Sequence, residues 1–151
     1  MAEMILRPAT RADTEAVTGL VAQAFAIYTP KIGKPPAPVF YDYGSLIETG
    51  LVSVACDGAA LMGMVYLYDQ DDGTAMLDVL AVAEAAQGRG VARQLIARAE
   101  DQAREMGARA LMVYTNAVMD GPLVIYPKLG FAETHRGESD GYQRVHFRKE
   151  L

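Results

Sequence analysis

The chain has 151 residues, which corresponds to a single domain over residues 1–151, and 51% of its residues are hydrophobic, enough for a packed core. Its only cysteine, Cys56, excludes an internal disulfide framework and a cysteine-based zinc site, and fits a reducing cytoplasm. Nineteen acidic against fourteen basic residues give a net charge of −5, which opposes nonspecific binding to nucleic acid or to an anionic membrane.

Neither a membrane span nor a leader peptide is expected. The longest apolar stretch, residues 59–68, is interrupted by Gly63 and is too short to cross a bilayer. At the N-terminus, residues 1–10 contain no basic segment that leads into an apolar one. We therefore expect a cytoplasmic protein with no membrane or nucleic-acid partner.

The first third of the chain predicts a strand, a helix and a proline-rich loop. Thr10 is a helix-capping residue, and Asp13 follows at the spacing of a capping-box variant. Four prolines and one glycine then favour a loop, followed by a second, short helix. The expected elements are a strand at 4–6, a helix ending near 26, a loop at 28–38 and a helix at about 40–48.

The rest of the chain alternates strands and helices. Asp57-Gly58 between two apolar runs is a strong hairpin signal. The expected strands are 51–56, 60–68, 74–82, 109–115, 131–136 and 142–148, and the expected helices are about 90–107 and 123–129. This order predicts an α/β (or α+β) protein with a central mixed sheet and helices on both faces.

The most informative segment joins the strand at 74–82 to the helix that begins near Gly90. Its loop, Gln87-Gly88-Arg89-Gly90-Val91-Ala92, brings glycines to a helix start, where backbone N–H groups are free and the dipole end is positive. This arrangement suits a phosphate. The segment is not a P-loop, because no Gly-Lys-Ser/Thr follows, and Arg93 stands where a dinucleotide fingerprint needs glycine.

The order of charges along this helix is the reverse of the usual one. Three arginines occupy the first half and three acids the second: Arg89, Arg93, Arg98, then Glu100, Asp101, Glu105. Each base near the N-terminus costs about 0.3–1 kcal/mol against the dipole, which a polyanionic ligand would offset. From spacing alone, a tight strand-to-helix turn with solvated arginines is an equally good interpretation.

Two motifs resemble the GNAT acetyltransferase superfamily. Gln87-x-x-Gly90-x-Ala92 is similar to the pattern with which that family binds the pyrophosphate of acetyl-coenzyme A, and Tyr126-Pro-Lys-Leu-Gly-Phe131 resembles its Tyr-x-x-Leu-Gly-Phe signature. The opening residues 5–10 also resemble a common start of the family. The resemblance implies the GNAT fold: a mixed, mostly antiparallel sheet of six to seven strands that splays in the middle.

The resemblance also implies the parts of a coenzyme site. Backbone groups of Leu80, Ala81 and Val82 would pair with the pantetheine arm like an added strand. Backbone amides of Gln87, Gly88, Arg89, Gly90, Val91 and Ala92, with Arg93, would hold the pyrophosphate. Asn116 would bond to the coenzyme, and a backbone N–H near Val82 would stabilise the oxyanion. Related sequences carry an asparagine at the position of Pro122, and proline offers the coenzyme neither an N–H donor nor a side-chain amide.

Transfer to an amine requires a base, because roughly one lysine-like amine in 2,500 is neutral at pH 7. Some relatives carry a glutamate at the position of Met76, which cannot accept a proton. Asp78 is the candidate base, and strand alternation places it on one face with Met76 and Leu80. A carboxylate bonded at the strand edge is the alternative role for Asp78. Tyr126 is the candidate donor to the leaving thiolate, with a core tyrosine as the alternative.

Other residues are set aside. Cys56 abuts a hairpin without a nearby histidine, and His135 and His146 lack metal-ligand spacing, so no metal is expected. Segment 69–73 departs from a calcium loop and is interpreted as a solvated hairpin. Three tyrosines fall in the region that covers the acceptor site in relatives, where they line a pocket or anchor the loop: Tyr28, Tyr41 and Tyr43.

The sequence thus predicts an acetyl-coenzyme A-dependent N-acetyltransferase that acts on a primary amine by direct attack in a ternary complex. Two alternatives remain: a noncatalytic acyl-coenzyme A sensor of the same fold, and a ligand-free protein that dimerises through its sheet edges. The acceptor is a small-molecule or peptide amine. Polyamines, amino acids, aminoglycosides and protein N-termini all stay open, and the resemblance alone suggests a homodimer.

Overall fold

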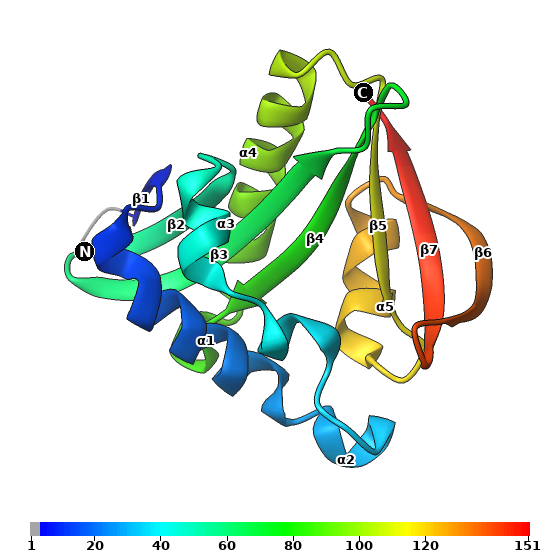
Figure 1. The fold of residues 1–151 in the computed structure, drawn as a ribbon, viewed down its shortest axis with the longest axis horizontal. Coiled ribbons are helices and arrows are strands. Elements are labelled where there is room, and N and C mark those ends of the chain that lie inside the picture. Colours follow the sequence, from blue (N-terminus) through cyan, green and yellow to red (C-terminus); the bar gives the residue numbers. More distant parts are fainter. Residues whose placement is uncertain (1–3) are drawn as a thin grey trace.

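The computed structural model describes residues 4–151 and contains one seven-stranded sheet in the order β1-β2-β3-β4-β5-β7-β6 (Figure 1). The strands are β1 Met4–Pro8, β2 Val52–Asp57, β3 Ala60–Asp69, β4 Thr74–Val82, β5 Ala110–Asn116, β6 Ala132–Ser139 and β7 Tyr142–Glu150. The β4–β5 pair is parallel and every other neighbouring pair is antiparallel. The predicted mixed, mostly antiparallel sheet is therefore confirmed.

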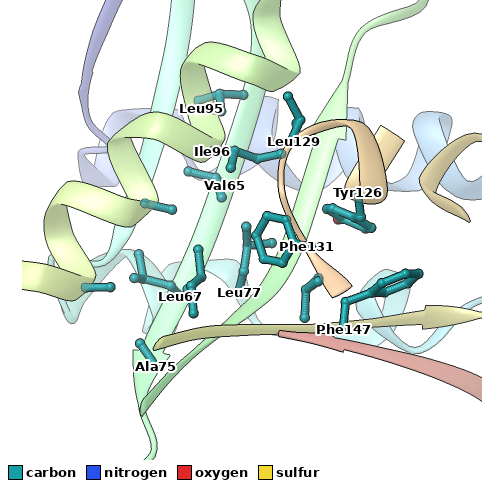
Figure 2. Packing of buried hydrophobic residues seen from close by; sticks show 14 of the residues in the cluster. Val65, Leu67, Ala75, Leu77, Leu95, Ile96, Tyr126, Leu129, Phe131 and Phe147 are labelled. Carbon is teal, nitrogen blue, oxygen red and sulfur yellow. The ribbon is translucent and has the colours of Figure 1, made fainter. Parts of the chain in front are cut away.

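The helices cover both faces of the sheet, as predicted. They are α1 Thr14–Ala26, α2 Thr29–Ile32, α3 Tyr43–Glu48, α4 Val91–Glu105 and α5 Asp120–Lys128. Buried side chains of α1 and α3 form one core cluster with the sheet, and those of α4 form a second core cluster on the sheet with Tyr126 of α5 and the residues that follow it. In the second cluster, Leu95 and Ile96 of α4 lie opposite Val65 of β3 (Figure 2).

A glycine in β3 sets how closely α4 approaches the sheet. A Cβ on Gly63 would lie 2.8 Å from Leu95 Cδ1, 2.9 Å from Val91 Cγ1 and 3.0 Å from the Ala81 carbonyl oxygen. No side chain fits at these distances, so only glycine allows the first turns of α4 to rest on β3 and β4. This contact fixes the start of α4 relative to the end of β4.

The proline-rich segment is more ordered than the predicted loop. It contains α2 and a 3-10 turn at Ala37–Phe40, and α3 begins at Tyr43, later than predicted. Pro30 lies in the first turn of α2, where its missing N–H needs no partner. Asp42 sets the later start, because its side chain accepts a hydrogen bond from the Ser45 N–H at 3.3 Å.

Two expectations at the N-terminus have different outcomes. Thr10 caps a 3-10 turn, Arg11–Asp13, with Asp13 completing the predicted capping box, and α1 follows directly. The expectation about a leader peptide rests partly on residues 1–3, which lie outside the described residues. Within residues 4–151, no helix has both the length and the apolar character that crossing a bilayer requires.

Candidate active site

The sheet splays between β4 and β5. These strands pair only from Thr74 to Leu77 on β4, although β4 continues to Val82, whereas β5 stays paired with β7 up to Asn116. The two strands diverge beyond this short ladder (Figure 1). The edge of β4 that faces β5 therefore carries no strand at Leu80, Ala81 and Val82, and all three residues line a groove.

The loop before α4 exposes backbone donors to this groove. Gly88 and Gly90 adopt φ values of 82° and 77°, which favour glycine, and Gly90 precedes α4 without a side-chain cap. The N–H groups of Gln87 and Arg89 bond within the loop, to the carbonyls of Glu84 and Ala86, both at 3.3 Å. No backbone bond within residues 4–151 uses the remaining amides at this end, those of Gly88, Gly90, Val91, Ala92 and Arg93.

The arginines of this region divide into two groups. Arg89 forms an ion pair with Asp57 at 3.2 Å, and Arg98 donates to Ser53 Oγ at 2.6 Å. Arg93 lines the groove. Because Arg89 and Arg98 are engaged by side chains of β2, the prediction from charge order that a polyanion binds here can now apply only to Arg93. Among the predicted coenzyme-loop residues, Arg89 alone does not line the groove.

The groove runs from the start of α4 to α5 and holds about 690 Å³. Its walls are mostly apolar and come from three helices besides the loop and the β4 edge. They include Phe25 and Tyr28 near the end of α1, and Met119 and Ile125 at α5. A long channel with amides at one end and apolar walls along the rest suits a chain with an anionic head.

A second, smaller pocket of about 70 Å³ adjoins the groove. Asp78 from β4, Tyr114 from β5 and Arg144 from β7 line it, and the segment Pro36–Pro38 lies against it. Five residues line both hollows: Phe25, Leu80, Met119, Pro122 and Tyr126. The two hollows therefore meet where the sheet opens.

Tyr126 lies at this junction. Its ring packs against Phe131 and Phe147 (Figure 2), and its centroid lies 5.5 and 5.8 Å from theirs. Burial raises the pKa of its hydroxyl above the ordinary value of 10.0, so the phenol keeps its proton. No side-chain hydrogen bond in the described part of the chain uses this hydroxyl. Tyr126 thus has the packed ring of a core tyrosine together with an unbonded hydroxyl, and its role as a donor to the leaving thiolate stays a prediction.

Asp78 occupies a β-bulge. Tyr66 pairs with Val79 and Leu67 pairs with Leu77, so Asp78 is the extra residue of β4. Leu77 packs in the α4 cluster and Val79 in the α1 cluster, which shows that strand alternation inverts here. The prediction that Asp78 shares a face with Leu80 by alternation is therefore wrong, because the bulge changes the phase of the strand.

The bulge directs Asp78 to two tyrosines. Tyr114 donates its hydroxyl to Asp78 Oδ1 at 2.8 Å. Burial raises the pKa of Asp78, while the nearby hydroxyl groups of Tyr114 and Tyr41 and the charge of Arg144 act in the opposite direction. The net shift is upward, which makes the carboxylate a stronger base than an exposed aspartate.

Asn116 lines the smaller pocket rather than the groove. Its Oδ1 accepts the Val118 N–H at 3.1 Å and so stabilises the turn that leads into α5. That helix begins at Asp120, earlier than predicted, because Pro122 lies in its first turn, where no N–H is required.

Sequence reasoning missed two residues of the smaller pocket, Tyr114 and Arg144. They lie on β5 and β7, and nothing in the linear sequence brings these two strands together. The register pairs Asn116 with Arg144 and so places the arginine beside the opening. A further signal was strand alternation, which puts Tyr114 and Asn116 on one face of β5.

Of the three tyrosines at 28, 41 and 43, only Tyr43 has one of the two expected roles. Tyr43 is buried and donates its hydroxyl to the Pro38 carbonyl at 2.7 Å, so it anchors the segment. Tyr41 lies near Asp78 and Tyr28 lines the groove, but neither of them lines the smaller pocket. His135 and His146 stack at 4.1 Å, and the described residues include no cluster of three or more metal-ligating side chains.

Comparisons with known proteins agree with this geometry. The family model described as Acetyltransferase (GNAT) family matches residues 20–131. PaiA N-acetyltransferase from Thermoplasma acidophilum, solved in complex with coenzyme A, is 15% identical with a TM-score of 0.80 over 99% of both chains. A GNAT family acetyltransferase from Elizabethkingia anophelis, solved with acetyl-CoA bound, is 21% identical with a TM-score of 0.73 over 98% of both chains.

A third structure, IAA acetyltransferase from Bacillus cereus ATCC 14579, is 20% identical with a TM-score of 0.74 and covers 99% of this chain and 100% of its own. At these identities the structures establish a shared fold. A search of curated protein sequences finds no significant match. Because the family model spans most of the chain and the sheet splays beside a free helix end, the chain belongs to the GNAT acetyltransferase family.

Proposed function

We propose that this chain transfers the acetyl group of acetyl-coenzyme A to a primary amine by direct attack in a complex of both substrates. The observation that carries the proposal is the meeting of two hollows at Tyr126. One hollow ends at unbonded backbone amides, and the other contains the raised-pKa carboxylate of Asp78. Direct transfer requires such an arrangement, because both substrates must reach one point at once.

The residues of the groove fit the coenzyme. The diphosphate binds at the positive end of α4, where the free backbone amides of Gly88 and of residues 90–93 donate to it. The Arg93 side chain adds a positive charge at the same place. The unpaired edge at Leu80–Val82 provides backbone donors and acceptors for the amide groups of the pantetheine arm. When bound, acetyl-coenzyme A supplies the acetyl group as an activated thioester.

Asp78 prepares the acceptor. An ammonium group cannot attack, so its proton must leave before the N–C bond forms and the C–S bond breaks. Asp78 accepts that proton directly or through water. The raised pKa of Asp78 lies closer to the pKa of the ammonium group, which makes this proton transfer less unfavourable. Tyr114 orients the carboxylate by donating a hydrogen bond of 2.8 Å to Oδ1.

Tyr126 stabilises the leaving group. Burial raises the pKa of its phenol well above that of an ordinary thiol, about 8.5. Full proton transfer from this phenol to a thiolate would therefore be unfavourable. Tyr126 instead donates a hydrogen bond to the thiolate, and the proton comes finally from solvent.

Amine-dependent thiol release from acetyl-coenzyme A tests the proposal. A panel of primary amines is incubated with the purified chain, and acetylated products are identified by mass spectrometry. Tyr126→Phe should lower kcat by about 10²-fold while coenzyme affinity stays unchanged, because only the thiolate contact is lost. Tyr68→Phe is the matched control, since Tyr68 lines neither hollow.

The two alternatives give different results. A sensor domain would bind the coenzyme tightly and release no thiol with any amine. A ligand-free interaction protein would show no change of melting temperature with coenzyme A. Either result would refute acetyl transfer.

A further inference from the structure

Arg144 occupies an unusual place in the smaller pocket. It lies on β7, opposite Asn116 of β5, and its side chain is 11% exposed. Its guanidinium carbon lies 4.3 Å from the ring centre of Tyr114 and 5.4 Å from that of Tyr142. Two aromatic rings thus hold a largely buried cation at the wall of the pocket.

Only part of this guanidinium is engaged. Nη1 donates to Ser139 Oγ at 2.8 Å and to Asp140 Oδ2 at 3.2 Å. Nε and Nη2 form no hydrogen bond with residues 4–151, and the partner carboxylate of Asp140 is itself 83% exposed. A fixed guanidinium with one engaged nitrogen and two unbonded ones is suited to a carboxylate, which it can bind through two parallel hydrogen bonds.

Tyr114 separates the two charges of the pocket. Its hydroxyl bonds Asp78, while its ring face lies against Arg144. The carboxylate and the guanidinium therefore stand about one phenol ring apart along the same wall. An acceptor with a second cation near its amine would be repelled by Arg144, which disfavours polyamines and aminoglycosides.

The size of the pocket also restricts the acceptor. It holds about 70 Å³, and Pro36–Pro38 lies against it. Tyr142 fastens this segment by donating its hydroxyl to the Pro35 carbonyl at 2.9 Å, and Lys34 Nζ lies 4.1 Å from the Tyr142 ring centre. A protein N-terminus would have to thread through this covered space, whereas a small molecule would not.

We propose that the acceptor is a free amino acid, whose amine faces Asp78 and whose carboxylate binds the unengaged edge of Arg144. This inference rests on the proposed acetyl transfer and narrows its acceptor. The positive amine of the amino acid then lies beside the negative Asp78, and its negative carboxylate lies beside the positive Arg144. This pairing orients the amine toward Tyr126 and the groove.

The test compares each amino acid with the amine left by its decarboxylation: alanine with ethylamine, methionine with 3-(methylthio)propylamine and phenylalanine with 2-phenylethylamine. kcat/KM is measured with saturating acetyl-coenzyme A and expressed per neutral amine, because the amine pKa values differ. A charge-assisted contact predicts a preference of about 10- to 100-fold for the best amino acid over its amine.

Arg144→Gln should abolish this preference, so that the ratio of kcat/KM for the amino acid to kcat/KM for its simple amine falls to about one. Because the ratio is taken within one variant, any effect of the lost charge on Asp78 applies to both substrates alike. Arg144→Lys should restore part of it, because lysine keeps the charge but not the paired donors. Arg148→Gln is the matched control: Arg148 lies on the same strand, lines neither hollow and pairs with Glu150 at 2.6 Å. Melting temperatures establish that each variant is folded.

Each result bears on the inference separately from the proposed function. Equal kcat/KM values for the amino acids and their decarboxylated amines would overturn the inference, and so would a preference for amino acids that persists in Arg144→Gln. Neither result would contradict acetyl transfer itself. Calorimetric titration of the coenzyme A complex with amino acids provides a second measurement. Binding that depends on Arg144, without turnover, would support the amino-acid site and refute acetyl transfer. No binding and no turnover would overturn the inference.

Discussion

A valine at Gly90 tests whether the free helix end holds the coenzyme. Gly90 has a φ of 77°, and a Cβ placed there meets no heavy atom within 4 Å, because it points into open space. A non-glycine residue in this conformation costs about 1–2 kcal/mol. The fold therefore survives, with a modest loss of stability, while the new side chain lies beside the unbonded amides of the groove.

The magnitude follows from those amides. A hydrogen bond to a charged group contributes about 1.5–3 kcal/mol, so displacing the diphosphate from one amide lowers affinity by about 10- to 100-fold. Gly107→Val separates this effect from backbone strain. Gly107 follows the opposite end of the same helix, with a φ of 83° and equally open space.

Isothermal titration calorimetry with coenzyme A and urea unfolding give the two readouts. Both variants should lose similar unfolding free energy, and only Gly90→Val should lose coenzyme affinity. Unchanged affinity in Gly90→Val, or an equal loss in both variants, would show that the loop does not hold the diphosphate.

Three further predictions concern pH and packing. Activity should fall as the pH decreases through the raised pKa of Asp78, because the base then becomes protonated. Asp78→Asn should lower kcat/KM by about 10²–10⁴-fold and remove this decrease from the pH profile. A decrease that persists in the variant would identify another base. Gly63→Ala should lower the unfolding free energy by about 1–3 kcal/mol in urea titrations, because its Cβ would lie 2.8 Å from Leu95 Cδ1; unchanged stability would contradict the close packing. Arg7 and the Thr10 N–H lower the pKa of Asp13 to about 2, so Asp13→Asn should cost about 0.5–2 kcal/mol at pH 7. The difference in unfolding free energy between Asp13→Asn and the unmodified chain should be complete above pH 3.8, the pKa of Asp13 in the unfolded state, and should vanish as the pH falls through about 2. Urea titrations at several pH values measure it. A difference that does not change with pH would refute the role of the carboxylate.

Local patterns were sufficient for most elements. β4 has the predicted bounds, Thr74–Val82, because a turn precedes it and its residues are mostly apolar. The Asp57-Gly58 hairpin and the end of α4 before Gly107 likewise depend on residues a few positions apart. The proline-rich segment was harder, because proline is compatible both with loops and with the first turn of a helix.

The bulge at Asp78 shows the limit of such patterns. Alternation assigns side chains to the two faces of a strand only while every residue is paired in turn. In β4 the pairing with β3 skips one residue, so the side chains beyond it point to the opposite faces from those expected. No residue type within β4 signals the shift. The direction of the candidate base was therefore a property of the pairing between two strands rather than of β4 alone.

The amino-acid sequence alone determined the family resemblance, the loop that opens α4 and the tyrosine of α5, because each is a short motif whose residues act within one turn or one helix. Tertiary structure alone decided which groups share the smaller pocket. Asp78, Tyr114 and Arg144 come from three strands, and only the register of β5 with β7 and the divergence of β4 from β5 bring them to one wall. Contacts between distant segments depend on packing of the whole sheet, which no local spacing encodes.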